Sequence, residues 1–112
     1  MIYLASPYSH PWPELRQARF LAAKNVVSKL MSAGKVVFSP IVYSHQFASE
    51  HGTDFRSWAK FNLEMLNLAD ELIVLMIDGW ELSEGVWTEV EHAKEIGKPV
   101  GYLNPQTMEV RP

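Results

Sequence analysis

The chain has 112 residues, of which 47% are hydrophobic and 21% are charged, so it suits one folded domain with a single core and excludes a disordered chain. It contains no cysteine, which excludes disulfides, thiolate catalysis and cysteine-ligated metals. The net charge of -3 argues against a nucleic-acid polymer as partner, because such partners require a basic excess.

The N-terminal sequence lacks the features of a targeting segment. It has no basic stretch and only a short apolar run before Ser6, so no signal peptide is predicted. No apolar run approaches the roughly 20 residues that a membrane helix needs. We therefore expect a cytoplasmic protein that has no membrane partner.

Strands and helices alternate along the chain. Asp54 and Ser83 are suited to cap helix starts, and Gly34 and Gly97 are suited to end helices. Continuous apolar runs are typical of strands that are buried on both faces. In chain order, the predicted elements are strand 1–5, helix 13–33, strand 35–38, a short helix around 43–50, helix 55–68, strand 71–77, helix 84–96, strand 98–103 and an irregular tail.

This alternation predicts the fold class. Strand-helix-strand units imply a parallel sheet with right-handed crossovers and helices on both faces. We expect a small three-layer α/β fold, flavodoxin-like or Rossmann-like, with four to five strands and residues 71–77 in the centre. Ligands of such sheets bind beyond the carboxyl ends of the strands, where the strand order reverses. Residues 6–12, 39–44 and 78–85 should gather there and form a polar pocket.

The first helix carries two apolar stripes. The predicted core-facing stripe consists of Leu15, Ala18, Ala22, Val26, Leu30 and Ala33. The second stripe consists of Phe20, Ala23, Val27 and Met31. This second stripe is covered either by a neighbouring loop or by another subunit.

Several familiar catalytic and cofactor motifs are absent. The sequence has no P-loop, no GxGxxG fingerprint, no HExxH and no GxSxG nucleophile elbow. Its four histidines are scattered along the chain. We therefore expect neither a metal ion nor a cofactor.

Two polar residues stand out by their helical position. Glu89 lies at the edge of the apolar face formed by Val86, Val90 and Ala93, in the second turn of a helix aimed at the pocket. A partly buried carboxyl of this kind suits acid-base or nucleophilic work, although a boundary glutamate paired with a lysine has the same pattern. Asn62 falls inside the apolar face of its helix, where it either caps a backbone group or contacts a ligand.

Three segments together resemble the nucleoside 2-deoxyribosyltransferase superfamily: IYLASPY, NLEMLNLADELIVL and SEGVWTEVEHAKEIGKPVGYL. The chain is most similar to the small branches, namely the deoxynucleoside 5′-monophosphate N-glycosidases and a related uncharacterised bacterial and phage family. The resemblance covers nearly the whole chain. It implies cleavage of an N-glycosidic bond, by hydrolysis or transfer, in a nucleoside or nucleoside 5′-monophosphate.

The resemblance also implies roles for individual residues. Glu89, four residues after Gly85 and four before Ala93, matches the nucleophile, and Tyr3 matches the tyrosine that orients it. Ser83 matches the serine that binds the 5′-phosphate in the monophosphate hydrolases, at a helix start that favours anions. In the first loop, Ser6, Tyr8, Ser9 and His10 are candidates for holding phosphate or ribose.

Asn62 departs from the family pattern, which commonly has an aspartate there to protonate or hold the leaving base. An amide cannot act as a general acid, which leaves three alternatives: the proton comes from another group such as Asp54, Asp78 or water, the substrate has a better leaving group, or the site binds without turnover. A non-catalytic nucleotide-binding or sensor module on the same scaffold is the main alternative to an enzyme, and an interaction protein is a third. The second stripe and the resemblance both favour a homodimer or a higher homo-oligomer.

Overall fold

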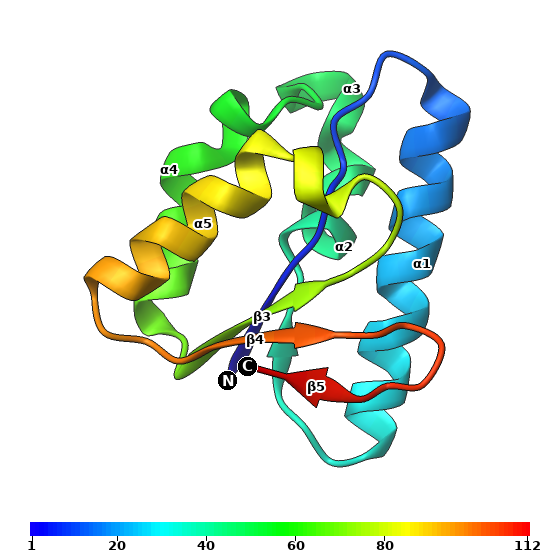
Figure 1. Ribbon diagram of the computed structural model, residues 1–112. Coiled ribbons are helices and arrows are strands. Elements are labelled where there is room, and N and C mark those ends of the chain that lie inside the picture. The colour runs from blue at the N-terminus through cyan, green and yellow to red at the C-terminus, as the bar shows by residue number, and fades with distance from the viewer.

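The protein folds around one sheet that lies between two layers of helices (Figure 1). A computed structural model describes residues 1–112. The strands are β1 (Ile2–Ala5), β2 (Val37–Phe38), β3 (Glu71–Leu75), β4 (Val100–Leu103) and β5 (Val110–Arg111). The helices are α1 (Pro13–Ser32), α2 (Pro40–Ser44), α3 (Ala48–His51), α4 (Phe55–Leu68) and α5 (Glu84–Glu95), with short 3-10 turns at His45–Phe47 and Trp80–Leu82.

The strand order is β2-β1-β3-β4-β5, with β1 to β4 parallel and β5 antiparallel to β4. The predicted α/β class is confirmed, and β3 is the central strand as predicted. The chain runs from β1 to β2 on one side and then returns to β3 on the other side of β1. The strand order therefore reverses between β1 and β3, which is where such sheets bind ligands.

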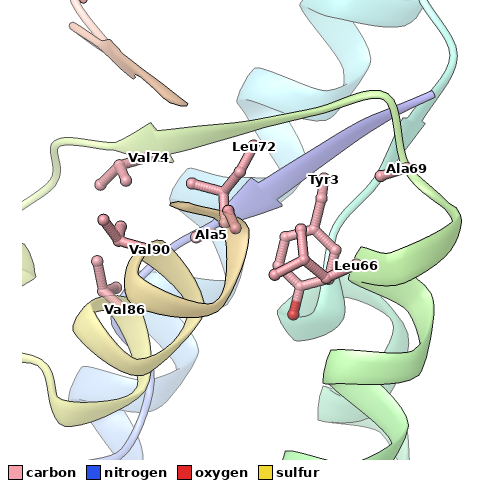
Figure 2. Close-up of a cluster of buried hydrophobic side chains, with 9 residues drawn as sticks. Tyr3, Ala5, Leu66, Ala69, Leu72, Val74, Val86 and Val90 are labelled. Atoms are coloured by element: carbon pink, nitrogen blue, oxygen red, sulfur yellow. The ribbon is translucent and has the colours of Figure 1, made fainter. Parts of the chain in front are cut away.

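The two faces of the sheet bury different side chains because residues alternate along each strand. Ile2 and Leu4 point toward α1, whereas Tyr3 and Ala5 point toward α4 and α5. Figure 2 shows the second group, with the Tyr3 ring directed between α4 and α5. Each large apolar side chain that is fully buried here stabilises the fold by about 1.5–3 kcal/mol.

The face of α1 that lies on the sheet combines parts of both predicted stripes. Val26 of the predicted core-facing stripe is buried, but so is Ala23 of the second stripe, while Ala18 and Ala33 of the core-facing stripe are exposed. The aromatic ring of Phe20 stacks on His45. Ala23 and Val27 of the second stripe pack in the core with side chains of the sheet, whereas Met31 is exposed. The chain itself therefore covers most of this stripe.

Other boundaries differ in detail. The tail was expected to be irregular, but Val110 and Arg111 form β5 by pairing with β4. The predicted short helix around 43–50 is a helical run from Pro40 to His51 in three pieces. Strand β3 ends at Leu75, two residues before the predicted end. None of the helices combines the length and the hydrophobicity required to cross a bilayer.

Candidate functional site

A cavity of about 710 Å³ opens at the carboxyl ends of β1 and β3, at the reversal of the strand order. All three segments that were expected to gather there contribute to its wall. Residues on α4 and α5 complete it. The cavity brings together all but one of the predicted site residues: Ser6, Tyr8, Ser9, His10, Asn62, Ser83, Gly85 and Glu89. The exception, Tyr3, lies behind Glu89 in the core.

Glu89 is the only carboxyl group among the buried residues. It is 3% exposed, which is deeper than the edge position that its helical spacing predicts. The Tyr3 hydroxyl donates a hydrogen bond to Glu89 Oε2 over 2.5 Å. The bond joins β1 to α5, so two elements far apart in sequence fix the orientation of this carboxyl group.

Burial raises the pKa of Glu89 from its ordinary value to about 8. The hydrogen bond from Tyr3 and the interaction with the Asn62 amide both lower this pKa, but they do not offset the burial. Burial and the nearby Glu89 carboxyl raise the pKa of Tyr3 well above its ordinary value, so Tyr3 remains a donor. Compared with an exposed glutamate, burial therefore favours the protonated form of Glu89.

Asn62 lies in the buried face of α4, as its helical position predicts, and is 5% exposed. Its Oδ1 atom has no hydrogen-bond partner. The Oγ atom of Ser6, a residue that is 7% exposed, is likewise without a partner. These are the only two buried side-chain polar atoms in the protein that lack a partner, and both belong to residues of the cavity wall.

The start of α5 also faces the cavity. Ser83 caps the helix by accepting a hydrogen bond from the backbone nitrogen of Val86 over 3.2 Å. Its hydroxyl proton remains free to be donated to a ligand. A Cβ atom at Gly85 would lie 2.8 Å from the ring of Phe55, so glycine allows the closest approach of α5 to the start of α4. The helix dipole and the cap together favour an anion here.

The first loop is held by its own hydrogen bonds. Ser9 Oγ donates to the carbonyl oxygen of Thr53 over 2.8 Å, and His10 Nδ1 accepts from the backbone nitrogen of Trp12 over 3.1 Å. The Tyr8 hydroxyl lies 2.6 Å from His45 Nδ1. Burial raises the pKa of Tyr8, so its phenol stays protonated. His45 Nε2 donates to Gln17 Oε1 over 2.7 Å, so Nδ1 of the neutral ring accepts the Tyr8 proton, and this bond ties the first loop to the helical segment after β2.

Two arginines in the cavity wall were missed by the sequence analysis. Arg19 Nη1 donates to the backbone oxygens of Tyr8 and Ser9, over 3.3 and 3.1 Å. Arg56 lies 3.7 Å from Glu84 on the surface at the start of α4. A guanidinium in the second turn of the helix after the first loop was the available signal for Arg19. Arg19 also lies beside Gly79, whereas Arg56 next to the start of α5 is paired with Glu84.

The positions of the two aspartates proposed as proton donors do not favour proton donation to a ligand in the cavity. Asp54 lies in the wall, but it caps α4 through Ser57, and those hydrogen bonds lower its pKa. Asp78 is exposed and is not among the residues of the cavity wall. No three histidine, aspartate or glutamate side chains lie close enough together to hold a metal ion.

The fold and the site define a small three-layer α/β protein with a buried glutamate in a cavity where the strand order reverses. The chain belongs to the DUF1937 family, which is described as a domain of unknown function and whose model matches residues 1–104. The match includes the whole cavity wall. A comparison with curated proteins gives no match.

Proposed function

We propose that the protein cleaves the N-glycosidic bond of a nucleoside or nucleoside 5′-monophosphate, by hydrolysis or transfer, with Glu89 as the nucleophile. The observation that supports this most is the position of Glu89, buried in the cavity wall and held by Tyr3 over 2.5 Å. An oriented, desolvated carboxyl beside a cavity is suited to covalent catalysis. The sequence resemblance to the nucleoside 2-deoxyribosyltransferase superfamily points to the same residue.

In the proposed reaction the Glu89 carboxylate attacks the anomeric carbon of the sugar. The bond between this carbon and the base breaks, and its electron pair goes to the base nitrogen, which takes up a proton. Water then attacks the glycosyl ester, so the sugar leaves with a new hydroxyl, Glu89 regains its carboxylate and one proton returns to solvent. A second base in place of water would give transfer.

The attack requires the ionised form of Glu89. Because its pKa is about 8, the fraction of Glu89 that is ionised grows as the pH rises toward that value. Tyr3 and Asn62 favour the carboxylate, and the positive charge that develops on the sugar favours it further. The proton for the leaving base comes from water.

The start of α5 is suited to a 5′-phosphate. Ser83 supplies a hydroxyl at the helix N-terminus, and Arg19 in the same cavity wall is not engaged in an ion pair, whereas Arg56 is paired with Glu84. We therefore favour monophosphates over unphosphorylated nucleosides as substrates. The proposal includes a cytoplasmic homodimer or higher homo-oligomer, which sedimentation at tens of micromolar protein tests.

The direct test is to incubate the protein with nucleosides and their 5′-monophosphates and to measure free base by chromatography. Glu89→Gln should reduce base release by roughly 10³-fold or more, because it removes the nucleophile. Glu91→Gln is the matched control, since Glu91 is an exposed glutamate on the same helix. Full activity of the Glu89→Gln protein would exclude the proposed role.

The alternative is a module that binds a nucleotide without cleaving it. Asn62 favours this alternative, because an amide cannot protonate the leaving base, and so does the raised pKa of Glu89, which favours its non-nucleophilic form. A binding module would be stabilised against heat by the nucleotide and would release no base. Free base above a control without protein would exclude it.

A further inference from the structure

The part of the cavity wall around Glu89 contains hydrogen-bonding capacity that the protein itself does not use. Asn62 Oδ1 and Ser6 Oγ are buried and have no partner, although buried polar atoms are normally paired. Asn62 interacts with the Glu89 carboxyl, and Ser6 follows the strand that carries Tyr3. Both residues line the cavity, so a partner from outside the protein approaches them from that side.

The stereochemistry of a nucleoside indicates which group would approach. In a β-nucleoside the base lies on one face of the sugar ring, and a nucleophile attacks the anomeric carbon from the opposite face. The 2′- and 3′-hydroxyls of ribose lie on this opposite face. A sugar presented to Glu89 for attack therefore directs its 2′-hydroxyl toward the residues around that carboxyl.

We propose that Asn62 and Ser6 select a sugar that has a hydroxyl next to the anomeric carbon, so that ribonucleosides and ribonucleotides are preferred over their 2′-deoxy counterparts. This inference rests on the proposed function, since it requires the anomeric carbon to lie at Glu89. The sequence resemblance alone implies the opposite preference, for 2′-deoxy sugars. Asn62 is also the residue at which the chain departs from that pattern.

The two side chains complement a hydroxyl in different ways. Asn62 Oδ1 can only accept, so it takes the hydroxyl proton of the sugar. Ser6 Oγ can donate to the sugar oxygen or accept from a second hydroxyl. A 2′-deoxy sugar leaves this capacity unused in a desolvated site, and sites built around a hydroxyl discriminate strongly against analogues that lack it.

The test compares AMP with dAMP, and adenosine with 2′-deoxyadenosine, in two measurements. The first is the release of adenine by the native protein. The second is calorimetric binding of AMP and dAMP to the Glu89→Gln protein, which measures selection without turnover. We expect the ribose form to be favoured by about tenfold or more in both measurements.

The outcomes separate this inference from the proposed function. Adenine release that is equal for both sugars, or faster from the deoxy form, overturns the inference and leaves the proposed function standing. Tighter binding of AMP than of dAMP with no adenine release from either supports the inference and overturns the catalytic proposal. Failure of AMP to bind or react overturns the inference, as does equal binding of AMP and dAMP.

Two variants assign the selection to its residues. Asn62→Leu removes the amide at similar volume and Ser6→Ala removes the hydroxyl, so each should bring the ratio of ribose to deoxyribose turnover toward one. Ser28→Ala is the matched control, because Ser28 is an exposed serine on α1. A ratio of ribose to deoxyribose turnover that is unchanged in folded Ser6→Ala and Asn62→Leu proteins contradicts the assignment. If either variant does not fold, the ratio measured with the native protein still tests the selection of ribose itself.

Discussion

The two faces of the sheet are built from the same strands but differ in chemistry. The face that packs on α1 is closed by aliphatic side chains such as Ile2, Leu4 and Val26. The face that packs on α4 and α5 is also built mainly from aliphatic side chains, but it contains Tyr3 and Glu89 as well. Buried polar groups cost stability unless they are paired, so their concentration on one face is the reason that the proposed site lies on that face.

Substitutions on the α1 face should affect stability alone. Leu4 is fully buried there, so Leu4→Ala should lower the free energy of unfolding by about 2–5 kcal/mol. Denaturant titration measures the loss. Base release per folded molecule should remain close to that of the native protein, and a large fall in folded Leu4→Ala protein would contradict the division between the two faces.

The α4 and α5 face should make stability depend on pH. Glu89 has a folded pKa of about 8, above its value in the unfolded chain, so between these values the folded protein binds a proton that the unfolded chain does not. This contribution to stability is fully present below the unfolded pKa and is lost as the pH rises through about 8. Through this group, the free energy of unfolding should fall with rising pH by at most about 1.4 kcal/mol per pH unit.

Glu89→Gln provides the control for this slope. Its free energy of unfolding should depend less on pH between about pH 5 and 8, because glutamine does not titrate. Denaturant titrations at a series of pH values measure both proteins. Identical slopes in the native and variant proteins would show that Glu89 does not hold the proton.

The Tyr3 hydroxyl is expected to act on the reaction through Glu89. Tyr3→Phe removes a hydrogen bond that lowers the Glu89 pKa, so that pKa should rise further. We expect base release at neutral pH to fall about 10- to 100-fold, and the ascending part of the pH profile to move to higher pH. A profile that is unchanged in position would make Tyr3 a packing residue only.

The smallest effect concerns the cap of α5. Ser83→Ala should cost about 1 kcal/mol, because it removes the hydrogen bond to Val86. If Ser83 also holds phosphate, KM should rise for monophosphates and not for unphosphorylated nucleosides. Ser39→Ala is a useful comparison, since Ser39 caps α2 in the same way and is absent from the cavity wall.

Local signals in the sequence predicted much of this structure. The cap residues Asp54 and Ser83 and the stop at Gly97 place α4 and α5 correctly. Helical spacing also predicted the burial of Asn62. These features depend on neighbours in the chain, so they can be recognised without the fold.

Features that depend on tertiary contacts could not be predicted in the same way. Strand β5 exists because it pairs with β4, and its two residues give no strand pattern of their own. The core-facing stripe of α1 was predicted only in part, because both stripes contain alanines and the packing against the sheet buries Val26 of one and Ala23 of the other. The full burial of Glu89 and the presence of Arg19 in the cavity wall likewise follow from how separate elements meet.

The most direct test of the central claim is intact-mass analysis of the protein quenched during turnover of AMP, followed by peptide mapping. We predict an added mass equal to the ribose 5-phosphate group in ester linkage, located on the peptide that contains Glu89 and absent from the Glu89→Gln protein. Adenine release with the adduct on another residue, or base release that persists in the Glu89→Gln protein, would contradict the account.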